Sequence, residues 1–94
     1  MTEPAPVQER TEAQVREQVL AVILDLAPNA AAMHGPETKL VEDLGYHSLA
    51  LLELAFALED EFDLEPIDEE TARKITNVQL VQDIVIKRIH ERSA

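Results

Sequence analysis

The chain has 94 residues, the length of one small domain, and its composition excludes several classes of protein. It has no cysteine, so it has neither a disulfide framework nor a thiolate metal site. Its 19 acids against 8 bases give a formal charge of -11, which disfavours nucleic acid and anionic membranes and favours basic protein surfaces. The sequence shows no secretory signal and no membrane span, and we expect a cytoplasmic monomer.

The first predicted element is a helix over residues 11–27. Residues 1–10 contain two prolines and mostly polar residues, which indicates a flexible N-terminal arm. Thr11 and Gln14 have the spacing of a capping box. Apolar residues then recur at intervals of three and four: Val15, Val19, Val22, Ile23 and Leu26. Pro28 cannot fit in a helix interior, so the helix ends before it.

A long connection follows, over residues 29–45. It contains Pro36 and both glycines of the chain. We expect three apolar residues, Leu40, Val41 and Leu44, to hold it against the helices. Because loops longer than about 12–15 residues are unusual in a compact domain without a function, this one draws attention to Ser48, which follows it.

The second predicted helix covers residues 48–62 and is unusually apolar. Leu49, Leu52 and Phe56 lie along one line of this helix. The neighbouring line is formed by Leu51, Ala55, Leu58 and Phe62. Together with Leu54 and Ala50 these residues cover too much of the circumference for all of them to be buried, so part of the apolar surface should be exposed.

Two further helices complete the prediction. Residues 68–74 form a short helix with Asp68 as its cap. A last helix begins at a capping box of Thr76 and Gln79, and residues 91–94 fray. Its buried stripe is formed by Val78, Val81, Ile84, Val85 and Ile89. The predicted fold is all-α, a four-helix bundle of three long helices and one short helix, with the domain spanning residues 11–90.

Ser48, at the start of the second helix, is the candidate functional residue. Serine is a favoured N-cap, so a purely structural role is one interpretation. A hydrolase nucleophile would need a base, an orienting group and an oxyanion hole, and the G-x-S-x-G elbow is absent. A metal site is disfavoured because the three histidines have no paired spacing.

A third interpretation uses more of the sequence. The segment D-L-G-Y-H-S-L-A-L-L-E-L, from Asp43, resembles the attachment site of acyl and peptidyl carrier proteins, whose motif is D-L-G-x-D-S-L. The segment A-L-E-D-E-F-D-L-E-P-I-D-E-E-T-A-R-K-I-T-N-V-Q-L-V-Q-D-I-V is similar to the stretch that follows in that family. The resemblance covers residues 11–89, with one extra residue near residues 72–74.

The resemblance implies a carrier of the acyl-carrier fold that catalyses no reaction itself. A phosphopantetheinyl transferase would move the 4'-phosphopantetheine arm of coenzyme A onto Ser48, and the arm's thiol would hold acyl groups as thioesters. Acyl-loading, synthase and releasing enzymes are the further partners implied. We expect a partner-binding surface on and next to the second helix, formed by His47, Leu49, Leu51, Leu52, Glu53, Phe56, Glu59 and Asp60.

Two departures from the family pattern matter: the residue before Ser48, and Ala50 and Leu51, which stand at positions that are often polar in the family. His47 stands where acyl carriers have Asp, whereas peptidyl carriers often have G-G-H-S-L. This mixture favours a carrier of polyketide or mixed specialised metabolism, with an aminoacyl or peptidyl carrier as the alternative. Leu52, Phe56 and Leu58, with residues of the last helix, form an alternative acyl-chain cleft. An alternative of another class is an unmodified acidic adaptor that binds basic surfaces. The run from Glu59 to Glu70, with eight acids and no base, agrees with a carrier and with an adaptor.

Overall fold

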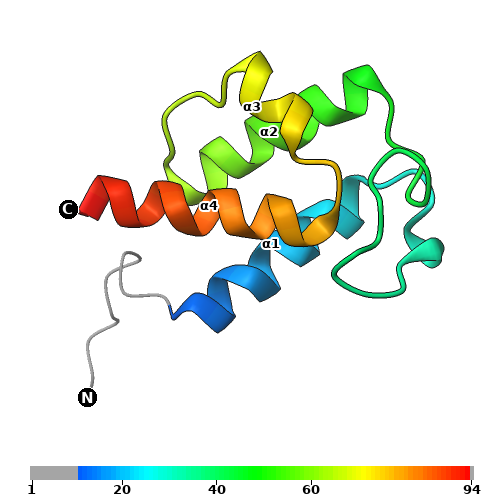
Figure 1. Ribbon diagram of the computed structural model, residues 1–94, viewed down its shortest axis with the longest axis horizontal. Helices are drawn as coiled ribbons and strands as arrows, with labels where there is room; N and C mark the ends of the chain where they lie inside the picture. The colour runs from blue at the N-terminus through cyan, green and yellow to red at the C-terminus, as the bar shows by residue number, and fades with distance from the viewer. Residues whose placement is uncertain (1–10, 94) are drawn as a thin grey trace.

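The computed structural model describes residues 11–93 and confirms the all-α, four-helix architecture (Figure 1). The elements are α1 (Glu12–Leu26), a 3-10 turn η2 (Ala30–Ala32), α2 (Ser48–Phe62), α3 (Glu69–Lys74) and α4 (Val78–Ser93). No strand occurs within these residues, only an isolated bridge between Lys39 and Asn77. None of the helices described is long and apolar enough to cross a membrane. The predicted arm, residues 1–10, lies outside the described part.

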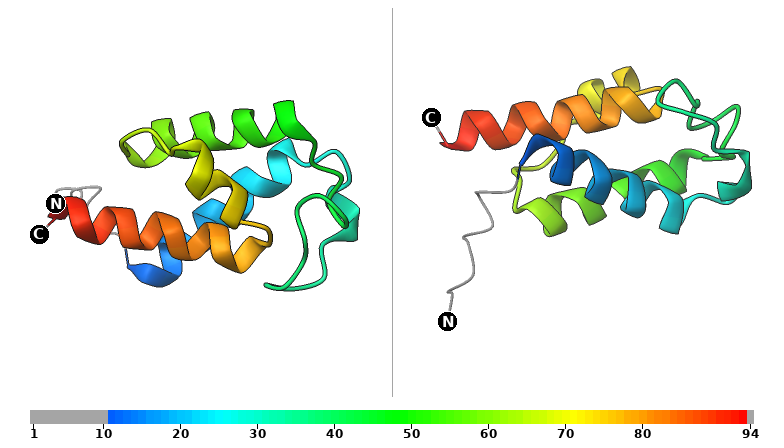
Figure 2. Two further views of the ribbon diagram at one scale, coloured as in Figure 1. Left: turned by 45° about the horizontal axis from the view of Figure 1, so that its top comes forward. Right: turned by 90° about the horizontal axis from the view of Figure 1, so that it is seen from below.

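The three long helices share one core. Helix α1 packs against both α2 and α4, and α3 lies over α2 and α4 (Figures 1 and 2). The periodic apolar residues of each helix meet inside, including Val19 and Ile23 of α1, Leu54 and Leu58 of α2, and Val81 and Val85 of α4. The long connection covers the end of the bundle where α1 ends and α2 begins (Figure 2).

Two of the three predicted helix caps are confirmed. Thr11 Oγ1 accepts a hydrogen bond from Gln14 N at 3.1 Å, and Gln14 Oε1 accepts one from Thr11 N at 2.9 Å, the reciprocal pair of a capping box. Asp68 Oδ1 accepts from Thr71 N at 3.1 Å and caps α3.

The predicted capping box at Thr76 and Gln79 is wrong, because α4 begins at Val78, one residue later than a cap at Thr76 requires. Asn77 is the cap, and its Oδ1 accepts a hydrogen bond from Leu80 N at 2.8 Å. The chain at Thr76 is still engaged with the long connection, since its carbonyl accepts from Leu40 N at 3.0 Å. The amide of Gln79 donates to Pro36 O at 2.9 Å, so the connection also binds the first turn of α4.

The long connection is held as expected by Leu40 and Leu44, which are buried, but not by Val41, which is exposed. The amide of Leu44 donates to Lys39 O at 3.0 Å and closes a tight turn. Val41 lies on the outside of this turn, which explains why it does not reach the core. Thr38 also fixes the connection to the bundle, which the sequence did not indicate. It is fully buried, and its carbonyl accepts a hydrogen bond from Val78 N at 3.0 Å.

Candidate functional site

Ser48 is the first residue of α2, and its side chain is exposed. The N-cap is His47, which has extended backbone angles and accepts from Ala50 N through Nδ1 at 3.4 Å. The N-cap interpretation of Ser48 is therefore wrong. Within residues 11–93 the Ser48 hydroxyl makes no hydrogen bond. An exposed hydroxyl with no structural partner is available to react.

The helix N-terminus around Ser48 suits an anionic group. The amides of Ser48 and Leu49 have no hydrogen-bond partner among the residues described, as expected in the first turn of a helix. Such amides, together with the positive end of the helix dipole, stabilise a phosphate placed next to them. No acidic residue lies in the first turn to oppose it. The site therefore fits a phosphodiester on the Ser48 oxygen.

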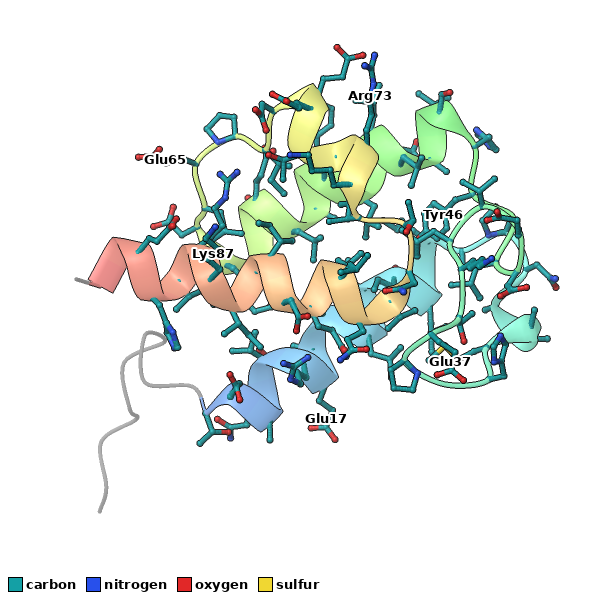
Figure 3. All side chains as sticks on the ribbon, viewed as in Figure 1. Glu17, Glu37, Tyr46, Glu65, Arg73 and Lys87 are labelled. Carbon is teal, nitrogen blue, oxygen red and sulfur yellow. The ribbon has the colours of Figure 1, made fainter. Side chains whose placement is uncertain are left out.

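The segment before Ser48 is fixed to the bundle by Tyr46. This side chain is 2% exposed, and its hydroxyl donates to Ile23 O of α1 at 2.7 Å. It lies where the connection meets the helices (Figure 3). Burial, with a smaller effect of the Asp25 charge, raises the pKa of Tyr46 to about 12. Tyr46 thus stays neutral and keeps donating at physiological pH, so that the chain two residues before Ser48 is held in place.

Gly45 allows the turn that precedes Tyr46. Its φ of 79° lies in the region that side chains disfavour, although a Cβ there would have room, 3.5 Å from Pro28 Cβ. Just before it, Leu44 O accepts from Asn29 N at 2.9 Å and Asp43 O accepts from Asn29 Nδ2 at 3.2 Å. The glycine of the motif is therefore required by backbone conformation.

Asp43 organises the other end of the motif. Its Oδ2 accepts from Lys39 N at 2.9 Å and lies 3.2 Å from His34 Nε2. The hydrogen bond from the Lys39 backbone, and then that with His34, hold the pKa of Asp43 below its usual value. Asp43 is therefore a structural anchor of the loop, and its carboxylate is already in use.

An apolar stripe next to Ser48 is exposed, as predicted for part of α2. Leu49, Leu52 and Phe56 are 61%, 54% and 63% exposed, and Glu53 and Asp60 are also exposed on this helix. Ala50 is buried instead. We name Leu49, Leu52 and Phe56 the α2 stripe.

Two of the predicted partner residues have roles within the fold. Leu51 is partly buried and packs against the core. Glu59 Oε2 accepts from Ile67 N at 2.8 Å and so holds the chain that leaves α2. The alternative cleft of Leu52, Phe56 and Leu58 is wrong, because Leu58 is fully buried on the opposite side of α2 from the other two.

Two residues of this site were missed from the sequence. The residues next to Tyr46 in the sequence do not indicate that it is buried, because its hydrogen-bond partner is a backbone carbonyl 23 residues away. His34 has no paired spacing with another histidine in the sequence, yet it lies beside Asp43 in the structure. Both contacts join segments whose proximity depends on the loop conformation.

The comparison with known proteins identifies the class. The family model described as "Phosphopantetheine attachment site" matches residues 17–80, and the chain belongs to this family of phosphopantetheine carriers. Within the family it is similar to acyl carrier proteins. That of Chlorobium phaeobacteroides is 40% identical over 78 residues, covering 83% of this chain and 99% of that protein. That of Nitratidesulfovibrio vulgaris is 45% identical over 65 residues, covering 69% of this chain and 84% of that protein.

These matches define what kind of protein the chain is. It belongs to the acyl carrier family, whose cofactor is a covalently attached 4'-phosphopantetheine, and it is a carrier and not a catalyst. The family works with phosphopantetheinyl transferases and synthase enzymes. The matches confirm the predicted family and cofactor, and the helices of the structure confirm the predicted fold class.

Proposed function

We propose that Ser48 carries the phosphopantetheine arm and that the protein holds acyl intermediates on it as thioesters. The observation that supports this most directly is the exposed Ser48 hydroxyl, which makes no hydrogen bond within the described residues and opens α2 directly after the D-L-G-Y-H segment. A nucleophile of a hydrolase would need a general base in reach. The neighbouring His47 instead accepts a hydrogen bond from the Ala50 amide through Nδ1.

The chain's own residues have three tasks in this function. The free amides of the first turn of α2 stabilise the phosphodiester charge. Tyr46 and Asp43 hold the loop, so that Ser48 stays at the end of the bundle. The transferase supplies the base that takes the Ser48 proton, because within residues 11–93 no side chain is hydrogen-bonded to the Ser48 hydroxyl. The arm provides the thiol, which agrees with the absence of cysteine.

We further propose that partner enzymes bind at the α2 stripe and the acids beside it. Exposed apolar side chains next to a reactive group, bordered by Glu53 and Asp60, have the arrangement of an interface with an apolar centre and a charged rim. His47 lies at the edge of this surface and is exposed. Leu51 and Glu59 belong to it only through their outward atoms, since each also has a role in the fold.

The pathway in which the carrier works is a separate proposal. His47 in place of the usual Asp, within acidic surroundings typical of acyl carriers, favours polyketide or mixed specialised metabolism. The similarity to acyl carrier proteins favours an acyl over an aminoacyl cargo. Mass analysis of the carrier isolated from its cells checks this: a malonyl-derived or polyketide thioester is expected, and an aminoacyl thioester would contradict it.

Incubation with coenzyme A and a promiscuous phosphopantetheinyl transferase tests Ser48. The intact mass should rise by one phosphopantetheine, and Ser48→Ala should abolish the gain. Thr76→Ala is the matched control, since it removes another exposed hydroxyl and should leave the gain unchanged. A mass gain that persists in Ser48→Ala would show another attachment residue. No gain in the unaltered protein would favour an unmodified acidic adaptor.

A further inference from the structure

We propose that His47 is a positioning residue for the phosphopantetheine arm: its neutral ring caps α2, whereas its protonated ring gives up the cap and donates a hydrogen bond to the phosphodiester on Ser48. The proposal rests on the attachment at Ser48 proposed above. It concerns the residue directly before the reactive serine, where acyl carriers have Asp. The root of the arm is then held to α2 by a contact that depends on pH.

The ring of His47 lies against the first turn of α2. Its Nδ1 is 3.4 Å from Ala50 N and accepts a hydrogen bond from that amide. Nδ1 can accept only while it carries no proton, so the cap requires the neutral ring with its single proton on Nε2. The structure thus shows His47 as an acceptor at the same helix end that would receive the arm.

Protonation reverses what His47 offers at this place. The imidazolium is a donor at both nitrogens and can no longer accept from Ala50 N. It also brings a positive charge to the positive end of the α2 dipole, which is unfavourable as long as no anion is present. A phosphodiester on Ser48 would supply that anion, and its oxygens could accept from His47 Nδ1 and, in place of the ring, from Ala50 N. The arm and the proton on His47 therefore stabilise each other.

An aspartate before the serine could not act in this way. A carboxylate can cap a helix, but when ionised it only accepts hydrogen bonds and it repels a phosphodiester beside it. Histidine is the side chain whose charge ordinarily changes between about pH 5 and 8. His47 therefore replaces a fixed negative charge next to Ser48 by a group that becomes a donor when it takes up a proton.

Within residues 11–93 the ring of His47 forms no ion pair with a charged side chain. The titratable and charged groups of the elements that meet near the start of α2 are Asp25 of α1, His34, Lys39, Glu42, Asp43 and Tyr46 of the connection, Glu53 of α2 and Arg73 of α3. The first turn of α4 adds none. Asp43 is engaged with Lys39 N and His34, and Arg73 pairs with Glu69 at 3.1 Å. The phosphodiester would therefore be the first anion in direct contact with His47.

NMR titration of the protein with and without the arm, from about pH 5 to pH 8, tests the proposal. The pH at which half of the His47 rings are protonated should rise by about half a pH unit when the arm is attached, because an anion beside the ring favours its charged form. The phosphorus resonance of the arm should follow the same curve, since a phosphodiester has no proton of its own to lose in this range. The Ala50 amide of the arm-free protein should shift with His47 as the cap is released.

Two controls separate this contact from the added charge of the arm. His90 is exposed near the end of α4, at the other end of the bundle from the start of α2, and should titrate alike in both forms (Figure 1). His47→Asn keeps a capping side chain without a titratable charge, so its phosphorus resonance should not change with pH.

Three outcomes would overturn the proposal while leaving the attachment intact. They are an unshifted His47 in the protein that carries the arm, an equal shift at His90, and a phosphorus resonance that still changes with pH in His47→Asn. Uptake of the arm is read separately from the intact mass. A protein that gains no mass would instead contradict the attachment at Ser48, and with it the role of His47.

Discussion

Tyr46 shows how one side chain can fix the position of the reactive residue. Tyr46→Phe keeps the ring but removes the hydrogen bond to Ile23 O. Because this leaves a buried carbonyl without that donor, we expect the free energy of unfolding to fall by about 1–3 kcal/mol. Urea unfolding at neutral pH measures it. An unchanged midpoint would show that the hydrogen bond adds nothing to stability.

The same residue predicts a dependence on alkaline pH. The folded state raises the pKa of Tyr46 from 10.0 to about 12, because burial disfavours the phenolate. Above pH 10 the unfolded chain loses this proton while the folded chain keeps it, so Tyr46 contributes less stability as the pH rises towards 12. The difference in unfolding free energy between the protein and Tyr46→Phe should therefore shrink over this range, and a constant difference would contradict the assignment.

A substitution of Phe56 can show whether this side chain serves partner binding and not stability. It is exposed on the α2 stripe, so Phe56→Ala should change the unfolding midpoint little. If the transferase binds this stripe, kcat/KM for arm transfer should fall by about tenfold, as expected for truncation of an aromatic interface residue. Leu80→Ala, an exposed apolar residue of α4, is the control. Equal effects of the two substitutions would exclude a specific role of the stripe.

For individual residues, prediction from the sequence succeeded at some positions and failed at others. Ser48 could be singled out because it stands in a motif that a family shares. The roles of Tyr46 and Thr38 could not, since their partners lie on other segments and the contacts arise from the path of the long connection. A polar residue with glycine or charged neighbours, such as Gly45 before Tyr46 or Glu37 before Thr38, looks exposed until its tertiary partner is known.

At the scale of elements, the start of α4 offers a direct comparison of two candidate caps. Asn77→Ala removes the acceptor for Leu80 N, and a lost N-cap costs about 1 kcal/mol. Thr76→Ala, at the position that the sequence favoured, should cost less, because the Thr76 side chain makes no cap. Thermal unfolding followed by circular dichroism ranks the two variants. A greater loss in Thr76→Ala would move the helix start back to the predicted position.

Helices were predicted well because their signals are local. Apolar residues that recur at every third or fourth position, with a capping residue such as Thr11 or Asp68 before them, can be recognised without the rest of the chain. The error at Thr76 and Asn77 had a tertiary cause: the backbone of Thr76 pairs with Leu40 and cannot yet begin a helix. The exposed position of Val41 has the same origin, since the turn that places it is closed by contacts within the connection.

For the whole molecule, the net charge of -11 predicts a dependence on salt. The structure extends 44 × 28 × 19 Å, so at about 0.01 M salt, with a Debye length of about 30 Å, most acids repel one another across it. At about 0.1 M the length falls to about 10 Å, and only neighbours interact. The melting temperature should therefore rise with salt, because compact states suffer most from self-repulsion.

The charge-reduced variant Glu17→Gln with Glu65→Gln provides the internal comparison for this effect. Its formal charge is -9, two less negative than -11. With less repulsion to screen, it should melt higher at low salt and gain less from added salt. Sodium and choline chloride should act alike if screening is the cause, whereas a response to one cation only would indicate a bound ion. A melting temperature that falls with salt would mean that attractive pairs such as Arg16 and Asp83 outweigh the repulsion.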